Sequence, residues 1–177
     1  KVSDPALLER AVDIARQHDP KVIVEEGFTN AREIECAVLV REGDAHASVL
    51  GEVRVHPDHE FYDFDAKYID DGADLIVPAE LPANVTKSVQ DMAIGAFRAL
   101  DCEGLARVDF FVKDDGAIFI NEVNTMPGFT PISMFPRLWA ASGVPYADLI
   151  DALIADALRR DRKSTRLNSS HLGISYA

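Results

Sequence analysis

The sequence predicts an α+β fold in which a mostly antiparallel sheet is flanked by helices. Three observations favour this class. Apolar and polar side chains alternate over Arg32–Arg41, as in a strand with one buried face. Ala106–Val112 and Ala117–Val123 alternate in the same way and enclose Asp115-Gly116, which is typical of a tight hairpin. Apolar residues at helical spacing precede and follow this hairpin, so helices are expected on both sides of it along the chain.

The N-terminal half is predicted to contain a helix, two further strands and a long loop. Asp4 and Pro5 suit the N-cap and the first position of a helix, and an apolar stripe follows them. Short β-branched runs predict strands over Lys21–Glu26 and Ser48–Val55. His56–Leu81 has weak periodicity, and loops of this length are usually functional or disordered.

The C-terminal half is predicted to contain three helices. Asn84 is expected to cap the first, whose inward-facing residues are Val89, Met92, Ala93, Ala96, Phe97 and Leu100. The other two cover Ser133–Ser142 and Tyr146–Arg160, and the last carries Leu149, Leu153, Ile154 and Leu158 at helical spacing. Residues 163–177 have no acidic residue and no helical or strand period. They resemble translated vector sequence, so we exclude this non-native tail from the predicted fold.

Composition excludes several classes of function. A chain of 177 residues with 47% hydrophobic content can form one domain with a proper core. A net charge of −12 argues against a nucleic-acid surface, and no apolar run approaches the roughly 20 residues of a membrane span. Cys36 and Cys102 lack metal or redox spacing, so we expect buried free thiols in a cytoplasmic protein. Because the first residue is Lys1, we expect a piece of a longer protein.

The predicted hairpin places four polar side chains on one face. With the turn at Asp115-Gly116, Asp109 lies directly opposite Glu122. Arg107 then lies opposite Asn124, whereas a turn one residue earlier pairs Arg107 with Glu122. In both registers the four side chains share a face, because side chains alternate along a strand.

Two interpretations of this face remain open from spacing alone. Opposed carboxylates have their Cβ atoms about 5 Å apart and repel each other. A magnesium ion held by the oxygens of Asp109, Glu122 and Asn124 would compensate this repulsion. Alternatively, the face is solvated and Arg107 neutralises both acids.

Five segments carry a recognisable set of motifs: Glu25–Gly27, Arg32–Leu39, Tyr62–Tyr68, Ala106–Asp109 and Ile120–Met134. Together they resemble the D-alanine–D-alanine ligases of the ATP-grasp superfamily over nearly all of residues 20–160. The acidic-to-amide pair at 122 and 124 is common to many ATP-grasp enzymes. The longer string Asn-Thr-x-Pro-Gly-Phe-Thr-x-x-Ser is highly specific.

The resemblance implies an ATP-grasp fold and an ATP-dependent ligation of two D-alanines to D-alanyl-D-alanine for peptidoglycan precursor synthesis. It implies ATP and two Mg²⁺ (or Mn²⁺) ions as cofactors, and an acyl-phosphate intermediate. Residues 1–24 would end the central subdomain, and residues 25–162 would form the C-terminal domain. We therefore expect negligible activity from the chain alone, and a cytoplasmic homodimer without nucleic-acid or membrane partners for the longer protein.

The resemblance also assigns roles to the hairpin and the loop after it. Asp109, Glu122 and Asn124 would hold the two ions, with Glu122 shared between them. Arg107 and the backbone N–H of Gly128 would stabilise the tetrahedral oxyanion. A glycine suits this position because backbone without a Cβ can approach a ligand closely.

Substrate and loop residues follow from the same resemblance. Ser133 and Met134 would position the second D-alanine; for Ser133 a helix N-cap is the alternative, and the two roles are compatible. Lys67 would reach the γ-phosphate from the long loop. Tyr68 would help to close this loop over the second substrate.

Four residues are implied to contact the nucleotide. Glu33 would bind the ribose hydroxyls, and the backbone near Glu25 or Glu26 would bind the adenine edge. Spacing leaves open which of these two glutamates is the functional one. Phe111 is a candidate for packing on the adenine ring, with a plain core aromatic as the alternative.

Two other functions remain as alternatives to the dipeptide ligase. One is another ATP-grasp ligase that joins a carboxylate to an amine. The other is a non-catalytic nucleotide-binding protein of the same fold, which could lose the metal triad; here all three ligands are present.

Overall fold

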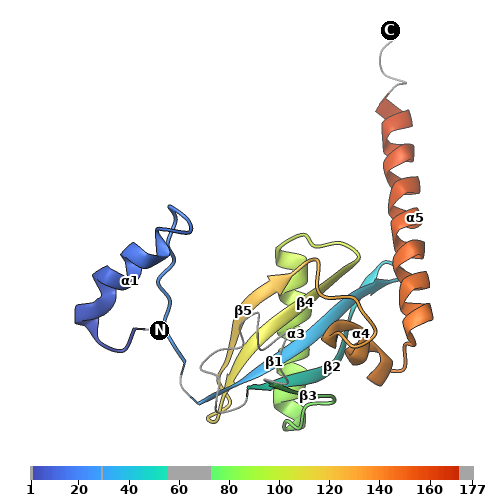
Figure 1. The fold of residues 1–177 in the computed structure, drawn as a ribbon. Helices are drawn as coiled ribbons and strands as arrows, with labels where there is room; N and C mark the ends of the chain where they lie inside the picture. The colour runs from blue at the N-terminus through green and yellow to red at the C-terminus, as the bar shows by residue number, and fades with distance from the viewer. Residues whose placement is uncertain (1, 29, 56–72, 172–177) are drawn as a thin grey trace. The chain divides into compact units, whose positions relative to one another are not determined.

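The computed structural model describes residues 2–28, 30–55 and 73–171, with side chains as far as Arg162. It divides the chain into two compact units, Lys1–Asn30 and Ala31–Ala177, and each is described by itself. Figure 1 shows the elements of both units.

The first unit contains a single short helical segment. The 3₁₀ turn η1 (Pro5–Leu7) leads into α1 (Leu8–Ala15), and the Asp4 carboxylate accepts the N–H of Ala6 at 2.9 Å. The predicted helix start is therefore confirmed. The predicted strand over Lys21–Glu26 is wrong, because the segment forms no strand in the structure. A β-branched run needs a neighbouring strand to supply its backbone hydrogen bonds.

The second unit is built on a five-stranded sheet in the order β3-β2-β1-β4-β5, in which every neighbouring pair is antiparallel. The strands are β1 (Ala31–Arg41), β2 (Asp44–Val55), β3 (Ala73–Ile76), β4 (Leu105–Lys113) and β5 (Ile118–Asn124). This confirms the predicted antiparallel sheet of the α+β class (Figure 1). The residues of the candidate site lie on the central strand β1, on its neighbour β4 and on the edge strand β5.

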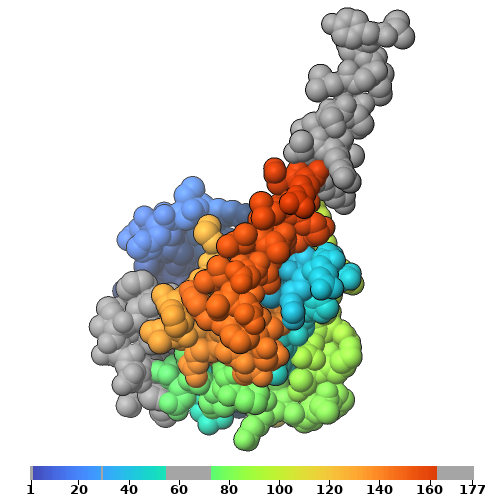
Figure 2. Space-filling view, turned by 90° about the vertical axis from the view of Figure 1, so that its right-hand side faces the viewer, coloured from blue at the N-terminus to red at the C-terminus, as the bar shows by residue number. Residues whose placement is uncertain are grey.

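Helices cover both faces of the sheet. On one face α3 (Ala83–Ala99) packs over a core that includes Ile34, Cys36, Leu50, Val89, Phe97, Val108 and Phe110. On the other face α4 (Met134–Ala141) and α5 (Tyr146–His171) enclose a second core, with Ala37, Leu39, Val53, Phe135, Leu138, Trp139 and Leu149. Figure 2 shows the first turns of α5, in orange, lying beside the β1–β2 hairpin, in cyan.

Several predicted boundaries need correction. The strand β2 begins at Asp44 rather than at Ser48, because Glu42 and Gly43 (φ 55° and 98°) form a two-residue hairpin turn. The segment predicted to be loop as far as Leu81 contains β3, whose backbone pairs with β2. Such a short strand has too few residues to show an alternating pattern, so its partner determines it.

The ends of α3 also differ from the prediction. The helix begins at Ala83 with Pro82 at the N-cap, so Asn84 lies inside the first turn instead of capping it. Leu100, predicted to face inward, is the C-cap residue and is 62% exposed. Apolar periodicity continues past the point where the backbone leaves the helix, which explains the error.

The tail that we excluded from the fold continues a helix. The helix α5 runs to His171, nine residues beyond Arg162. The predicted helix over Tyr146–Arg160 is therefore too short at its C-terminal end, while the non-native origin of residues 163–177 stays a prediction. Extending an existing helix costs little compared with nucleating one, so a sequence without amphipathic spacing can still propagate it.

The two cysteines differ in environment. Cys36 is buried on β1, and burial raises the pKa of its thiol to about 12. Cys102 is only half-buried, so the expectation of two buried thiols is right for one of them. Both are free thiols, as predicted.

Among the described residues, no single helix is long and apolar enough to cross a membrane. The pair Met134–Ala141 and Tyr146–Arg162 passes this test together by length and composition, with a bend of 102° between them.

Candidate active site

The hairpin between β4 and β5 has a three-residue turn, not the predicted two-residue turn. The N–H of Lys113 donates to the carbonyl of Ala117 at 2.9 Å, and the N–H of Gly116 donates to the carbonyl of Lys113 at 2.9 Å. Gly116 has a φ of 85°, a conformation that favours glycine. A three-residue hairpin with a left-handed glycine is a common turn. It shifts the pairing of the two strands by one residue relative to the prediction.

A β-bulge at Asn121 reverses this shift before the site is reached. Phe110 pairs with Ile120, whereas Asp109 pairs with Glu122, so Asn121 is the extra residue. Without the bulge, Glu122 would point to the opposite face of the sheet. Bulges often redirect a side chain next to an active site.

The structure therefore brings the four predicted hairpin residues together. Arg107 donates through Nε and Nη2 to the two oxygens of Asp109, both at 2.7 Å. The amide of Asn124 donates to Asp109 Oδ2 at 3.2 Å and to Glu122 Oε1 at 2.8 Å. The pairing of Asp109 with Glu122 and of Arg107 with Asn124 confirms the first of the two registers considered from sequence.

A fifth residue, Glu35, belongs to the same cluster and was missed by the sequence analysis. It lies on β1 in register with Asp109, is 6% exposed, and places Oε2 at 3.1 Å from Arg107 Nε. Alternation along β1 indicated that Glu33 and Glu35 share a face. That face could be linked to the hairpin only once β1 was known to pair with β4.

The electrostatics of the cluster are unbalanced towards negative charge. Burial raises the pKa of Asp109, the hydrogen bond and charge of Arg107 oppose this, and the nearby charge of Glu122 raises it further. The net shift is upward. Burial by itself lowers the pKa of Arg107, but Asp109 and Glu35 more than offset it and the net shift is upward too. One arginine thus faces three acids, and the site favours an additional cation.

The donor set fits a hard divalent cation. Asp109 and Glu122 offer carboxylate oxygens, and Asn124 offers an amide oxygen once its side chain rotates; magnesium commonly takes one or two carboxylates. Within the described ranges, no group of three or more His, Cys, Asp or Glu side chains is arranged to hold a metal ion. The predicted set contains only two such residues. A cation would also have to share Asp109 with Arg107, so both interpretations of this face retain support.

The loop between β5 and α4 is held by hydrogen bonds at both sides of one peptide unit. The hydroxyl of Tyr146 donates to the carbonyl of Phe129 at 2.8 Å, and the N–H of Thr130 donates to Ser133 Oγ at 3.1 Å. A Cβ on Gly128 would lie 3.0 Å from Ser133 Oγ, so any larger residue would press against this hydroxyl. The predicted oxyanion donor, the Gly128 N–H, therefore lies one residue before a peptide unit that is hydrogen-bonded on both sides.

Ser133 and Met134 differ from their simplest sequence interpretations. Ser133 occupies the N-cap position of α4, but among the described residues its hydroxyl makes no capping bond and bonds to Thr130 instead. Met134 is buried in the core beneath α4, where its sulfur lies 2.8 Å from the position of a Cβ on Gly51.

The predicted nucleotide residues are only partly placed. Glu33 on β1 pairs in register with Phe111 on β4, on the face that carries the acidic cluster. Glu25 and Glu26 are exposed residues of the first unit, which is described by itself. Lys67 and Tyr68 lie outside the described residues.

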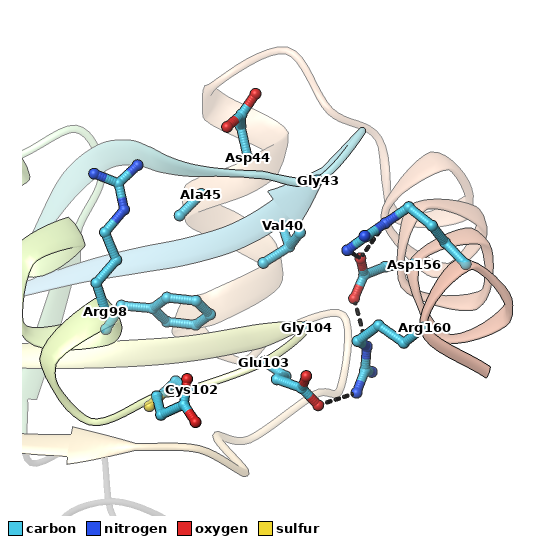
Figure 3. Close-up of a pocket in the computed structure, with 13 residues that line it drawn as sticks. Val40, Gly43, Asp44, Ala45, Arg98, Cys102, Glu103, Gly104, Asp156 and Arg160 are labelled. Carbon is cyan, nitrogen blue, oxygen red and sulfur yellow. Dashed lines mark hydrogen bonds and ion pairs between the residues drawn. The ribbon is translucent and has the colours of Figure 1, made fainter. Parts of the chain in front are cut away.

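A separate hollow of about 680 Å³ lies where β1 ends and β4 begins. The Asp156 carboxylate pairs with both Arg159 and Arg160. Figure 3 shows Arg160 between Asp156 and Glu103, with which it also pairs. None of the residues predicted for the active site lines it. The charges of Asp156, Arg160 and Glu103 are already paired with one another, and the pair between Arg160 and Glu103 holds α5 against the end of the sheet.

The fold and the hairpin cluster define the C-terminal part of an ATP-grasp ligase. Residues 1–155 match the family described as D-ala D-ala ligase C-terminus. The chain belongs to this family, which confirms the family predicted from the motifs.

Known proteins agree with this assignment. The chain is 54% identical over 165 residues to the D-alanine–D-alanine ligase of Mycobacterium sp. (strain KMS), covering 90% of this chain and 44% of the relative. It is similar in structure to the D-alanine–D-alanine ligase of Coxiella burnetii, with a TM-score of 0.81, 37% identity, and 96% and 44% of the two chains covered. The VanG D-Ala:D-Ser ligase of Enterococcus faecalis follows with a TM-score of 0.74 and 34% identity, over 86% and 43% of the chains. The chain thus spans less than half the length of these relatives.

Proposed function

We propose that this chain forms part of an enzyme that joins two D-alanines to D-alanyl-D-alanine at the expense of ATP. The observation that carries the proposal is the opposition of Asp109 and Glu122 across the hairpin, with Arg107 bonded to Asp109. Like charges are placed together where a cation and phosphates are to be bound. The family membership and the relatives' names support the same reaction.

Asp109, Glu122 and Asn124 would hold two Mg²⁺ (or Mn²⁺) ions. When bound, such ions neutralise the charge on the phosphates of ATP. Asp109 occupies Nε and Nη2 of Arg107, which leaves the Nη1 donors for the oxyanion. The backbone N–H of Gly128 would be the second oxyanion donor.

The remaining residues would bind and enclose the substrates. Ser133 would bind the carboxylate of the second D-alanine, and Glu33 the ribose of ATP, with Glu25 or Glu26 and Phe111 at the adenine. Lys67 and Tyr68 would cover the γ-phosphate and the second substrate. We propose residues 1–24 as the end of the central subdomain, residues 25–162 as the C-terminal domain, and a cytoplasmic homodimer as the complete enzyme.

A chimera tests the reaction. The chain replaces the matching segment of the Mycobacterium ligase, and phosphate release is measured with ATP, magnesium and D-alanine as the only amino acid. We expect phosphate release that depends on both magnesium and D-alanine, with D-alanyl-D-alanine as product. A folded chimera that releases no phosphate contradicts a ligase of this kind. If the chimera reacts faster with D-serine or D-lactate as acceptor, D-alanine is not the preferred second substrate.

A further inference from the structure

We propose that Glu35 is a positioning residue that fixes the guanidinium of Arg107. It thereby orients the N–H groups of Arg107 that would donate to the oxyanion. The inference rests on the proposed function, because it concerns the arginine to which that function gives a role. None of the motif-based roles involves Glu35.

The geometry places Glu35 directly against the arginine. Register pairs Glu35 with Asp109 and Ala37 with Arg107 across β1 and β4. The small side chain of Ala37, which is fully buried, leaves room for the guanidinium beside it. Arg107 Nε then lies between two carboxylates, 2.7 Å from Asp109 Oδ1 and 3.1 Å from Glu35 Oε2.

The burial of Glu35 calls for a reason beyond stability. Its side chain is 9% exposed and that of Arg107 is 12% exposed, so both charges are largely withdrawn from water. Asp109 already accepts hydrogen bonds from Nε and Nη2 of Arg107, which is enough for a structural pair. Burying a further carboxylate carries a desolvation cost before its attraction to the arginine is counted. A residue kept at such a cost is expected to serve the site.

The second carboxylate allows Asp109 to share its charge with another ligand. If Asp109 binds a cation, its hold on Arg107 weakens, and an arginine held by one partner alone would move. Glu35 reaches the same Nε from β1 and keeps the guanidinium in place. Because it touches neither substrate nor cation in this scheme, Glu35 acts only through Arg107, and such supporting partners typically affect activity 10- to 100-fold.

The matched control is Glu103, which also pairs with an arginine but lies outside the candidate site. Glu103 lies 2.5 Å from Arg160, its side chain is 63% exposed, and it has no place in the proposed machinery. Glu103→Gln therefore removes one acid–arginine contact without touching the site. Its kcat is expected to equal that of the unsubstituted chimera.

The test compares Glu35→Gln, Glu35→Asp and Glu103→Gln in the chimera. For Glu35→Gln we expect kcat to fall roughly 10- to 100-fold with the KM for ATP nearly unchanged, and Glu35→Asp to lose less. In the 177-residue chain, Glu35→Gln should also shift the Arg107 Nε–H resonance, whereas Glu103→Gln should leave it in place.

Full kcat in a folded Glu35→Gln chimera, or an unmoved Arg107 resonance, overturns the inference. If Glu35→Gln fails to fold, Glu35→Asp decides, since full kcat in that variant overturns it equally. An unsubstituted chimera without ligase activity would contradict the proposed function instead, so the two failures are distinguishable.

Discussion

Two arginine–carboxylate pairs on opposite faces of the sheet have nearly the same geometry. Arg32 bonds the two oxygens of Glu52 at 2.9 and 2.7 Å, as Arg107 bonds those of Asp109 at 2.7 Å each. Their electrostatics are opposite. Arg32 lowers the pKa of Glu52, whereas burial and Glu122 raise the pKa of Asp109 despite Arg107.

The difference comes from the third charge at each pair. Glu52 has a second arginine nearby, with Arg54 Nη2 at 3.3 Å, so its negative charge is fully compensated. Asp109 has a second acid nearby, Glu122, which pairs with it across the hairpin. The first pair joins β1 to β2 and also reaches the carbonyl of Glu80 through Arg32, which is a stabilising role. A pair left with surplus negative charge is instead typical of a functional site.

The largest expected effect is on turnover. In the chimera, Glu122→Gln should lower kcat about 10²- to 10³-fold, because it removes a charge from the place where phosphoryl charge develops. Steady-state phosphate release at saturating magnesium measures this. Glu52→Gln is the control from the other face. Assayed well below its unfolding temperature, it should have the same kcat as the unsubstituted chimera. Near-normal turnover in Glu122→Gln would contradict a functional role for the cluster of Arg107, Asp109 and Glu122.

The next effect is on stability and concerns the other pair. Glu52→Gln should lower the free energy of unfolding by roughly 2 kcal/mol, since a largely buried charged hydrogen bond to Arg32 is lost. The folded pKa of Glu52 is depressed below the ordinary 4.5, so its contribution is complete above that pH. It disappears as pH falls through the depressed folded pKa. Urea unfolding of the unsubstituted chain and of Glu52→Gln, from pH 7 downward, measures the difference in their free energies of unfolding. This difference should shrink below about pH 4.5. A difference that stays constant with pH contradicts the stabilising role of the Glu52 charge.

The smallest effect is predicted for Asp109→Asn in the isolated chain. Relief of the repulsion with Glu122 offsets the lost bonds to Arg107, so the free energy of unfolding should change by at most about 1 kcal/mol. Urea unfolding at pH 7 beside Glu52→Gln provides the measurement. If Asp109→Asn is the more destabilising of the two, the cluster on this face is a stabilising pair like the other one.

The hairpin shows how far sequence reasoning reached. Alternation over Ala106–Val112 and Ala117–Val123 was enough to predict two strands, and alternation with the expected turn placed four polar residues on their common face. The predicted two-residue turn was wrong, yet the register at Asp109 and Glu122 was right, because the bulge at Asn121 cancels the longer turn. Local patterns do not contain such a compensation, since a bulge depends on the partner strand.

The sequence by itself determined the class of the sheet, the helix that begins at Asp4 and Pro5, the family, and the four residues of the hairpin cluster. These follow from side-chain alternation, capping residues and motifs, which are local properties of the chain. Only the tertiary structure decided that β1 pairs with β4 and brings Glu35 against Arg107, that β3 completes the sheet, and that Ser133 bonds to Thr130 instead of capping α4. The bond between Ser133 and Thr130 is local and depends on the conformation of the loop before α4. The position of Glu35 and the pairing of β3 depend on which distant segment supplies the partner for a charge or a backbone hydrogen bond, and the packing of the two cores makes that choice.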